Sequence, residues 1–134
     1  SAASDVYKRQ DNKIRKVVIC SGKIYYDLLE EREKVKINDI VLVRLEQLYP
    51  FPAKTLAKIL KKYNKAKFIW CQEEPKNMGA WNTVRNYIER TLEMINFKDI
   101  NIKYVGRSAS STTATGNANK HLAQQKEILE KILK

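Results

Sequence analysis

Two short segments and one arginine supply polar side chains that could bind an anion or move a proton. The first segment, Cys20-Ser21-Gly22-Lys23, closes an apolar run and opens an amphipathic stretch. Free N–H groups at a helix N-terminus attract anions, Gly22 lets a ligand approach the main chain, and Lys23 adds positive charge. A tight turn with Ser21 as the helix cap explains the same residues equally well. The spacing is not that of a P-loop, so ATP hydrolysis is not indicated.

The second segment and the arginine follow two later apolar runs. Gln72, Glu73 and Glu74 come after one run, and Arg107 comes after the next. Adjacent carboxylates suit acid–base chemistry or a metal, but neighbours in an extended segment point opposite ways, which favours a structural role for one of them. An arginine in this position suits bidentate binding of phosphate or carboxylate. The alternative is an ion pair with Glu73 or Glu74, which we favour for the empty site.

The remaining reactive side chains form no recognisable catalytic or metal pattern. His121 has no Ser, Cys or Asp partner at triad spacing. Cys20 and Cys71 are too few and too far apart for a disulfide framework or a metal site, and we expect buried, reduced thiols in a reducing compartment. A structural or interface role is predicted for four residues: Glu46, Glu74, Trp81 and His121.

The elements that position these residues alternate between strand and helix. β-Branched runs predict strands at residues 16–20, 40–45, 67–71 and 102–105. Amphipathic stretches predict helices at residues 23–35, from Pro52 onward, at 78–95 and at 118–133, with Val35 and Leu122 among the inward side chains. This alternation predicts a three-layer α/β fold, with a mainly parallel open sheet of four to five strands and helices on both faces.

Ligands of such sheets bind beyond the carboxyl ends of the strands. We therefore expect one anion-binding edge, formed by the residues that follow three of the predicted strands. These residues are Ser21, Gly22, Lys23, Gln72 and Arg107.

Length and composition describe one globular domain. The chain has 134 residues, 43% of them hydrophobic and 31% charged. No apolar stretch reaches the roughly 18–20 residues of a transmembrane helix. The N-terminus has no apolar h-region, so we expect no secretory signal. The net charge of +11 allows nucleic-acid binding, but aromatic residues do not interleave the lysines, so a solvated basic face is favoured. Residues 1–12 have no usable periodicity and are interpreted as a linker or an added segment, leaving a single domain at 13–134.

Four segments resemble the closing domain of one enzyme family, the thiamine-dependent decarboxylating component of 2-oxoglutarate dehydrogenase. They are CSGKIYYDL (20–28), VRLEQLYPFP (43–52), WCQEEPKNMGAW (70–81) and YVGRSASSTTATGNANKH (104–121). The resemblance covers about residues 14–133, in order and without apparent gaps. The Tyr-Pro-Phe-Pro and Gln-Glu-Glu-Pro-x-Asn-x-Gly-Ala-Trp runs point to this family more narrowly than to other transketolase-like C-terminal domains.

The resemblance implies a transketolase-like C-terminal fold and a role within a larger enzyme. That enzyme is a homodimer of the bacterial cytoplasm or the mitochondrial matrix. It uses thiamine diphosphate and Mg²⁺, both bound outside this domain, to decarboxylate 2-oxoglutarate in the tricarboxylic acid cycle. It then passes the succinyl group to the lipoyl arm of its partner acyltransferase. The domain itself is expected to be non-catalytic, to support dimer packing and to help bind an effector, AMP or acetyl-CoA.

Two alternatives stay open at this point. One is a stand-alone basic α/β module that binds a nucleotide or nucleic acid. The other is a relative that acts on 2-oxoadipate or forms a semialdehyde, because substrate choice depends on residues outside this sequence.

Overall fold

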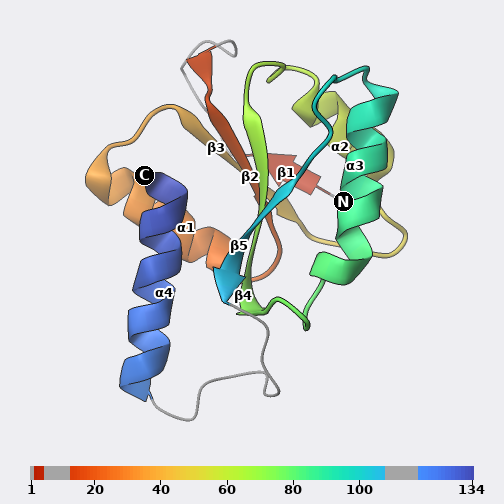
Figure 1. Ribbon diagram of the computed structural model, residues 1–134. Coiled ribbons are helices and arrows are strands. Elements are labelled where there is room, and N and C mark those ends of the chain that lie inside the picture. The colour runs from red at the N-terminus through yellow and green to blue at the C-terminus, as the bar shows by residue number, and fades with distance from the viewer. Residues whose placement is uncertain (1, 5–12, 108–117) are drawn as a thin grey trace.

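The computed structural model describes residues 2–4, 13–107 and 118–134 (Figure 1). Strands and helices alternate along the chain as the sequence predicts. The strands are β1 (Ala2–Ser4), β2 (Lys16–Cys20), β3 (Ile40–Leu45), β4 (Lys67–Pro75) and β5 (Lys103–Arg107). The helices are α1 (Ile24–Val35), α2 (Ala53–Leu60), α3 (Trp81–Met94) and α4 (Ala118–Leu133).

The strands form one sheet in the order β1-β3-β2-β4-β5. The four longer strands run parallel, and β1 pairs with β3 in the antiparallel direction. This confirms the predicted mainly parallel sheet. Strand β1 was not anticipated, because it lies in the segment interpreted as a linker or an added segment. Residues 5–12 lie outside the described part of the chain, and the origin of residues 1–12 stays a prediction.

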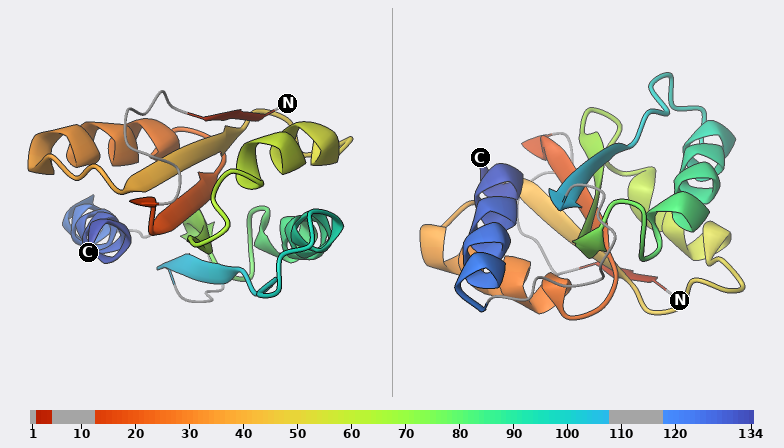
Figure 2. Two further views of the ribbon diagram at one scale, coloured as in Figure 1. Left: turned by 90° about the horizontal axis from the view of Figure 1, so that it is seen from above. Right: turned by 60° about the horizontal axis from the view of Figure 1, so that its bottom comes forward.

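Helices cover both faces of the sheet, which gives the three expected layers (Figures 1 and 2). Alternate side chains of β2 enter two separate apolar cores. Val17 and Ile19 join the core beneath α2 and α3, whereas Val18 and Cys20 join the core beneath α1 and α4. Because both faces are covered, the strand side chains are buried on both sides, as their continuous apolar runs predicted.

Two predicted inward side chains point to solvent instead. Val35 is 48% exposed and Leu122 is 65% exposed. Val35 is the last residue of α1, which ends where Lys36 adopts a left-handed conformation with φ of 59°. Leu122 lies in the first turns of α4, which extend past the carboxyl ends of the strands (Figure 1). Neither residue therefore has a sheet surface to cover.

Candidate functional site

The order of the strands creates a switch point between β2 and β4. The chain passes from β2 to β3 on one side and then crosses to β4 on the other side. Connections that leave adjacent strand ends in opposite directions open a crevice, which is where ligands of such sheets bind. A hollow of about 500 Å³ lies there, and we call it the switch-point hollow. Its lining includes Ser21, Gly22, Gln72, Glu74 and Gly79.

The turn after β2 does not form the cap that the sequence suggested. The N-cap residue of α1 is Lys23, with no side-chain hydrogen bond to the helix, so the prediction of Ser21 as cap is wrong. Gly22 has a φ of 83°, which strains any residue with a side chain. Nothing lies within 4 Å of the position that a Cβ on Gly22 would occupy, so the main chain is open to the hollow there.

Gln72 lines the same hollow, but its side-chain amide is fully used within the protein. The residue is 2% exposed. Its Nε2 lies within hydrogen-bond distance of three main-chain carbonyls, so that one of its two N–H groups is shared between two acceptors. Its Oε1 accepts from two N–H groups, which uses the full capacity of a primary amide. The acceptors are the carbonyls of Glu74 (3.1 Å), Pro75 (2.9 Å) and Met78 (2.8 Å), and the donors are the indole of Trp70 (2.9 Å) and the main chain of Trp81 (3.1 Å). Gln72 therefore holds the loop between β4 and α3 in place.

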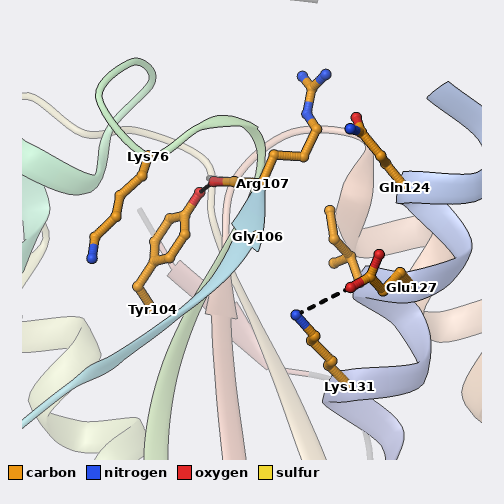
Figure 3. A pocket seen from close by; sticks show the side chains of 8 residues that line it. Lys76, Tyr104, Gly106, Arg107, Gln124, Glu127 and Lys131 are labelled. Atoms are coloured by element: carbon orange, nitrogen blue, oxygen red, sulfur yellow. Dashed lines mark hydrogen bonds and ion pairs between the residues drawn. The ribbon is translucent and has the colours of Figure 1, made fainter. Parts of the chain in front are cut away.

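A second hollow, of about 390 Å³, lies between β5 and α4, and we call it the β5–α4 hollow (Figure 3). Its lining contains three cationic side chains and one acidic side chain. These are Lys76, Arg107, Lys131 and Glu127, beside Tyr104, Gly106, Gln124 and Ile128. The Lys131 ammonium lies 3.3 Å from the Glu127 carboxylate. The net positive charge suits an anionic ligand.

Main-chain contacts shape the floor of this second hollow. The Tyr104 hydroxyl donates to the carbonyl of Arg107 at 2.6 Å, and burial raises the pKa of Tyr104 to about 12. The phenol is therefore a neutral hydrogen-bond donor at physiological pH. A Cβ on Gly106 would lie 2.6 Å from the Tyr104 hydroxyl and 2.8 Å from the carbonyl oxygen of Gln72, so only glycine fits there.

Glu73 contacts two residues of the predicted anion-binding set. Its carboxylate lies 3.7 Å from the Lys23 ammonium, and its main-chain carbonyl accepts a 2.6 Å hydrogen bond from Nε of Arg107. The side chains of Lys23 and Arg107 therefore both contact the same residue of β4. The contact of Arg107 with Glu73 is a hydrogen bond to the main chain, and the Glu73 carboxylate lies beside Lys23 instead. The predicted ion pair of Arg107 with Glu73 or Glu74 stays a prediction.

The structure divides the predicted anion-binding set between the two hollows. The switch-point hollow is lined by Ser21, Gly22 and Gln72, and the β5–α4 hollow is lined by Arg107. Lys23 lines neither hollow and pairs with the Glu73 carboxylate. Sequence reasoning missed three further residues of the second hollow, namely Lys76, Gln124 and Lys131. For Gln124 and Lys131 the available signal was the amphipathic pattern of α4, which does not say which strand the helix covers. Lys76 lies in the loop after β4, where no pattern pointed to the hollow.

The four residues assigned structural or interface roles lie in different surroundings. Trp81 is 5% exposed, with its ring centroid 5.4 Å from that of Tyr104. Glu46 is exposed and accepts a 2.7 Å hydrogen bond from Arg44. Glu74 lines the switch-point hollow. The side chain of His121 lies outside the described part of the structure.

The described side chains bring together no reactive constellation. No group of three or more His, Cys, Asp or Glu side chains converges among the described residues as a metal site would require. Burial raises the pKa of both cysteines, that of Cys71 to about 12, so both are protonated at neutral pH. None of the helices that the structure describes is long and apolar enough to cross a membrane. The two hollows can hold a ligand, with main-chain N–H groups beside one and cations around the other.

Comparison with known proteins gives consistent matches over almost the whole chain. The family model described as 2-oxoglutarate dehydrogenase C-terminal matches residues 2–133. The 2-oxoglutarate dehydrogenase E1 components of Brucella anthropi, Brucella ovis and Brucella abortus are each 54% identical to this chain over 125 residues. The match covers 93% of this chain and 12% of each relative. The chain thus spans about an eighth of the length of these relatives.

Proposed function

Because the chain belongs to the 2-oxoglutarate dehydrogenase C-terminal family, we propose that it is the closing domain of a much longer enzyme. That enzyme decarboxylates 2-oxoglutarate oxidatively and transfers the succinyl group to a lipoyl acyltransferase. The observation that carries the proposal is the match over residues 2–133, together with 54% identity to E1 components. As a homodimer, the whole enzyme works in the bacterial cytoplasm or the mitochondrial matrix.

We place the catalytic chemistry in the part of the enzyme outside this domain. Thiamine diphosphate, bound with Mg²⁺, would supply the carbanion-stabilising chemistry. Among the described residues, no set of three or more His, Cys, Asp or Glu side chains comes together to hold the metal ion. We therefore derive no catalytic step from this domain, and cofactor binding elsewhere in the enzyme stays a prediction.

The domain's own role in the proposal is to bind an anionic effector, such as AMP or acetyl-CoA. The charge of the β5–α4 hollow supports this role, because three cations and one carboxylate line it. Arg107 is the residue best suited to a phosphate, with a planar fork that can donate two parallel hydrogen bonds. Among the described residues, the buried Oε1 of Gln124 has no hydrogen-bond donor, and an adenine amino group would supply one.

The structure also changes how the proposed effector set is arranged. Gln72 supports the site by holding its loop, because all of its amide capacity is used inside the protein. Ser21, Gly22 and Lys23 then contact the part of the ligand that extends from Arg107 toward the switch-point hollow. The contacts of Glu73 with both Lys23 and Arg107 place these two cations near one another, which supports this arrangement of the ligand.

The test is a calorimetric titration of the full-length enzyme with AMP, with acetyl-CoA and with a short DNA duplex. Saturable nucleotide binding that weakens at least tenfold in Arg107→Ala supports the proposal. The matched control is Arg90→Ala, which removes an exposed arginine of α3, away from both hollows. Unchanged effector response in Arg107→Ala would show that the effector role is wrong. Salt-sensitive DNA binding without nucleotide binding would instead favour a nucleic-acid module.

A further inference from the structure

Two cysteines that are far apart in the sequence lie side by side on neighbouring strands. Cys20 on β2 and Cys71 on β4 are direct register partners in the parallel ladder. Register partners on adjacent strands point to the same face of a sheet, and both cysteines belong to the apolar core beneath α1 and α4. Both are fully buried and both are free thiols. From the sequence we judged them too few and too far apart for a disulfide framework or a metal site, and the strand order brings them together.

We propose that Cys20 and Cys71 are a modification site, a dithiol that a hydroperoxide converts reversibly into an intramolecular disulfide. Neighbouring strands lie about 4.8 Å apart. That spacing falls inside the range of about 4.4–6.8 Å between the Cα atoms of disulfide-bonded cysteines. The strands therefore already hold the two residues at a separation that the bond can span.

The same geometry makes the disulfide easy to reduce. The Cβ atoms of register partners in parallel strands keep roughly the strand spacing of about 4.8 Å, whereas a relaxed disulfide prefers about 3.5–4.5 Å. Bond formation must draw β2 and β4 together by a few tenths of an ångström, roughly the difference between those two ranges. A disulfide strained in this way is more oxidising than a structural one, so cellular thiols reverse it. Reversibility is what an intracellular redox site requires.

Little in the protein opposes movement of the sulfurs toward one another. The Sγ of Cys20 donates a weak hydrogen bond to the carbonyl of Val43, with a separation of 3.8 Å. Turning that side chain toward Cys71 breaks this hydrogen bond. The rest of the surroundings is apolar, with Ile128 and Ile132 of α4 among the residues that cover the pair.

Burial controls the rate of the reaction. Because burial raises the pKa of both thiols, neither is a thiolate at neutral pH, and the thiolate is the form that attacks a peroxide. Oxidation therefore proceeds through openings of α4 that admit water and the oxidant to the pair. A dithiol of this kind responds to sustained oxidant and not to brief exposure.

The chemistry is balanced with the hydroperoxide as the named oxidant. One thiolate attacks an oxygen of the peroxide, which gives a sulfenic acid and releases water or an alcohol once the leaving oxygen is protonated. The second thiolate attacks the sulfenic sulfur, the S–S bond forms, and the hydroxyl leaves as water. Two thiols lose two electrons and two protons, and the O–O bond accepts the two electrons.

The bond forms at the base of the candidate site. Cys20 directly precedes Ser21, and Cys71 directly precedes Gln72, which both line the switch-point hollow. Drawing the two strand ends together therefore narrows that hollow. This consequence follows from the positions of the residues, whatever ligand the hollow binds.

The test uses the native full-length enzyme, exposed to hydrogen peroxide and then quenched in acid, alkylated and digested with trypsin without reduction. Trypsin releases Cys20 in peptide 17–23 and Cys71 in peptide 68–76, because lysines flank both segments. We expect these two peptides joined, two hydrogen atoms lighter than their sum, and separated again by dithiothreitol. The joined pair should form more than tenfold less in enzyme unfolded in urea before oxidation, where other cysteines compete.

Met94, which is 61% exposed, reports that the peroxide reached the protein. Oxidised Met94 together with free thiols, or with separate sulfinic acids at Cys20 and Cys71, would overturn the proposal. The variant Cys71→Ser is the matched control, because it keeps the fold position of β4 and leaves Cys20 without its register partner. Suppose that Cys20 of this variant still formed a disulfide with another cysteine. If it did so to the same extent as it pairs with Cys71 in the native enzyme, the register pairing would not be the cause of the oxidation.

Discussion

Replacement of Gln72 tests whether the loop that borders both hollows depends on one buried amide. In Gln72→Met the side chain keeps nearly the same volume but loses all five hydrogen bonds of the amide. A buried hydrogen bond contributes about 1 kcal/mol net, and a buried polar group left without a partner costs about 1–3 kcal/mol. The hollow beside the residue admits water, which restores part of the loss.

We therefore expect Gln72→Met to lower the free energy of unfolding by about 3 kcal/mol. Gln72→Ala should cost about 1–2 kcal/mol more, because it also leaves a cavity. Urea denaturation followed by tryptophan fluorescence measures both changes. The chain contains two tryptophans, and the structure places both in hydrogen bonds with Gln72. The fluorescence of the folded state should therefore also shift, because the indole of Trp70 loses its hydrogen bond and the main chain of Trp81 loses another.

Thr83→Ala is the control, because this exposed residue lines the same hollow without bonding to Gln72. A loss below about 1 kcal/mol in Gln72→Met, with unchanged fluorescence of the folded state, would refute the reasoning. That result would mean that water replaces the amide completely and that the loop keeps its shape unaided. The five hydrogen bonds of Gln72 would then contribute little to the free energy of unfolding.

Three further predictions concern packing and titration. Gly106→Ala should destabilise the fold by about 2 kcal/mol in thermal or urea unfolding, because its Cβ would overlap the Tyr104 hydroxyl. Above pH 9 the free energy of unfolding should fall by about 1.4 kcal/mol per pH unit for each raised thiol. The pKa of Cys71 is raised from 9.0 to about 12, so its contribution is complete below pH 9 and is lost between those values. Titration of stability against pH should give a shallower fall in Cys71→Ala. Finally, Leu122→Lys should change stability by less than about 0.5 kcal/mol, whereas Ile132→Ala should cost about 2–4 kcal/mol, since the first side chain is exposed and the second is fully buried. Equal losses in the two variants would contradict the orientation of α4.

Local patterns were sufficient to predict most of the elements. The strands at residues 16–20 and 40–45 have the predicted bounds, because continuous β-branched runs are a local property of the chain. Strand β4 reaches Pro75 and not residue 71, since its last residues are polar and gain their strand conformation from pairing with β5. Strand β1 has only three residues, and its pairing with β3 has no local signal.

The candidate site was predictable in part. The sequence located the carboxyl ends of the strands and the polar residues that follow them, because a strand-to-helix connection in a parallel sheet must turn at that edge. It could not show that the amide of Gln72 bonds inward or that Arg107 faces α4. The first depends on the position of the loop between β4 and α3, and the second depends on the position of α4.

The sequence by itself determined the alternation of strands and helices, the family and the edge of the sheet that holds the polar residues. Those features follow from periodicity and short motifs, which need only neighbouring residues. Tertiary structure alone decided the strand order, and with it which distant groups meet. Because β4 lies beside β2 and not beside β3, Cys20 faces Cys71. Because α4 packs beside β5, the cations of three separate segments surround one hollow. Contacts of this kind arise from the burial of whole faces against one another, which no single stretch of sequence encodes.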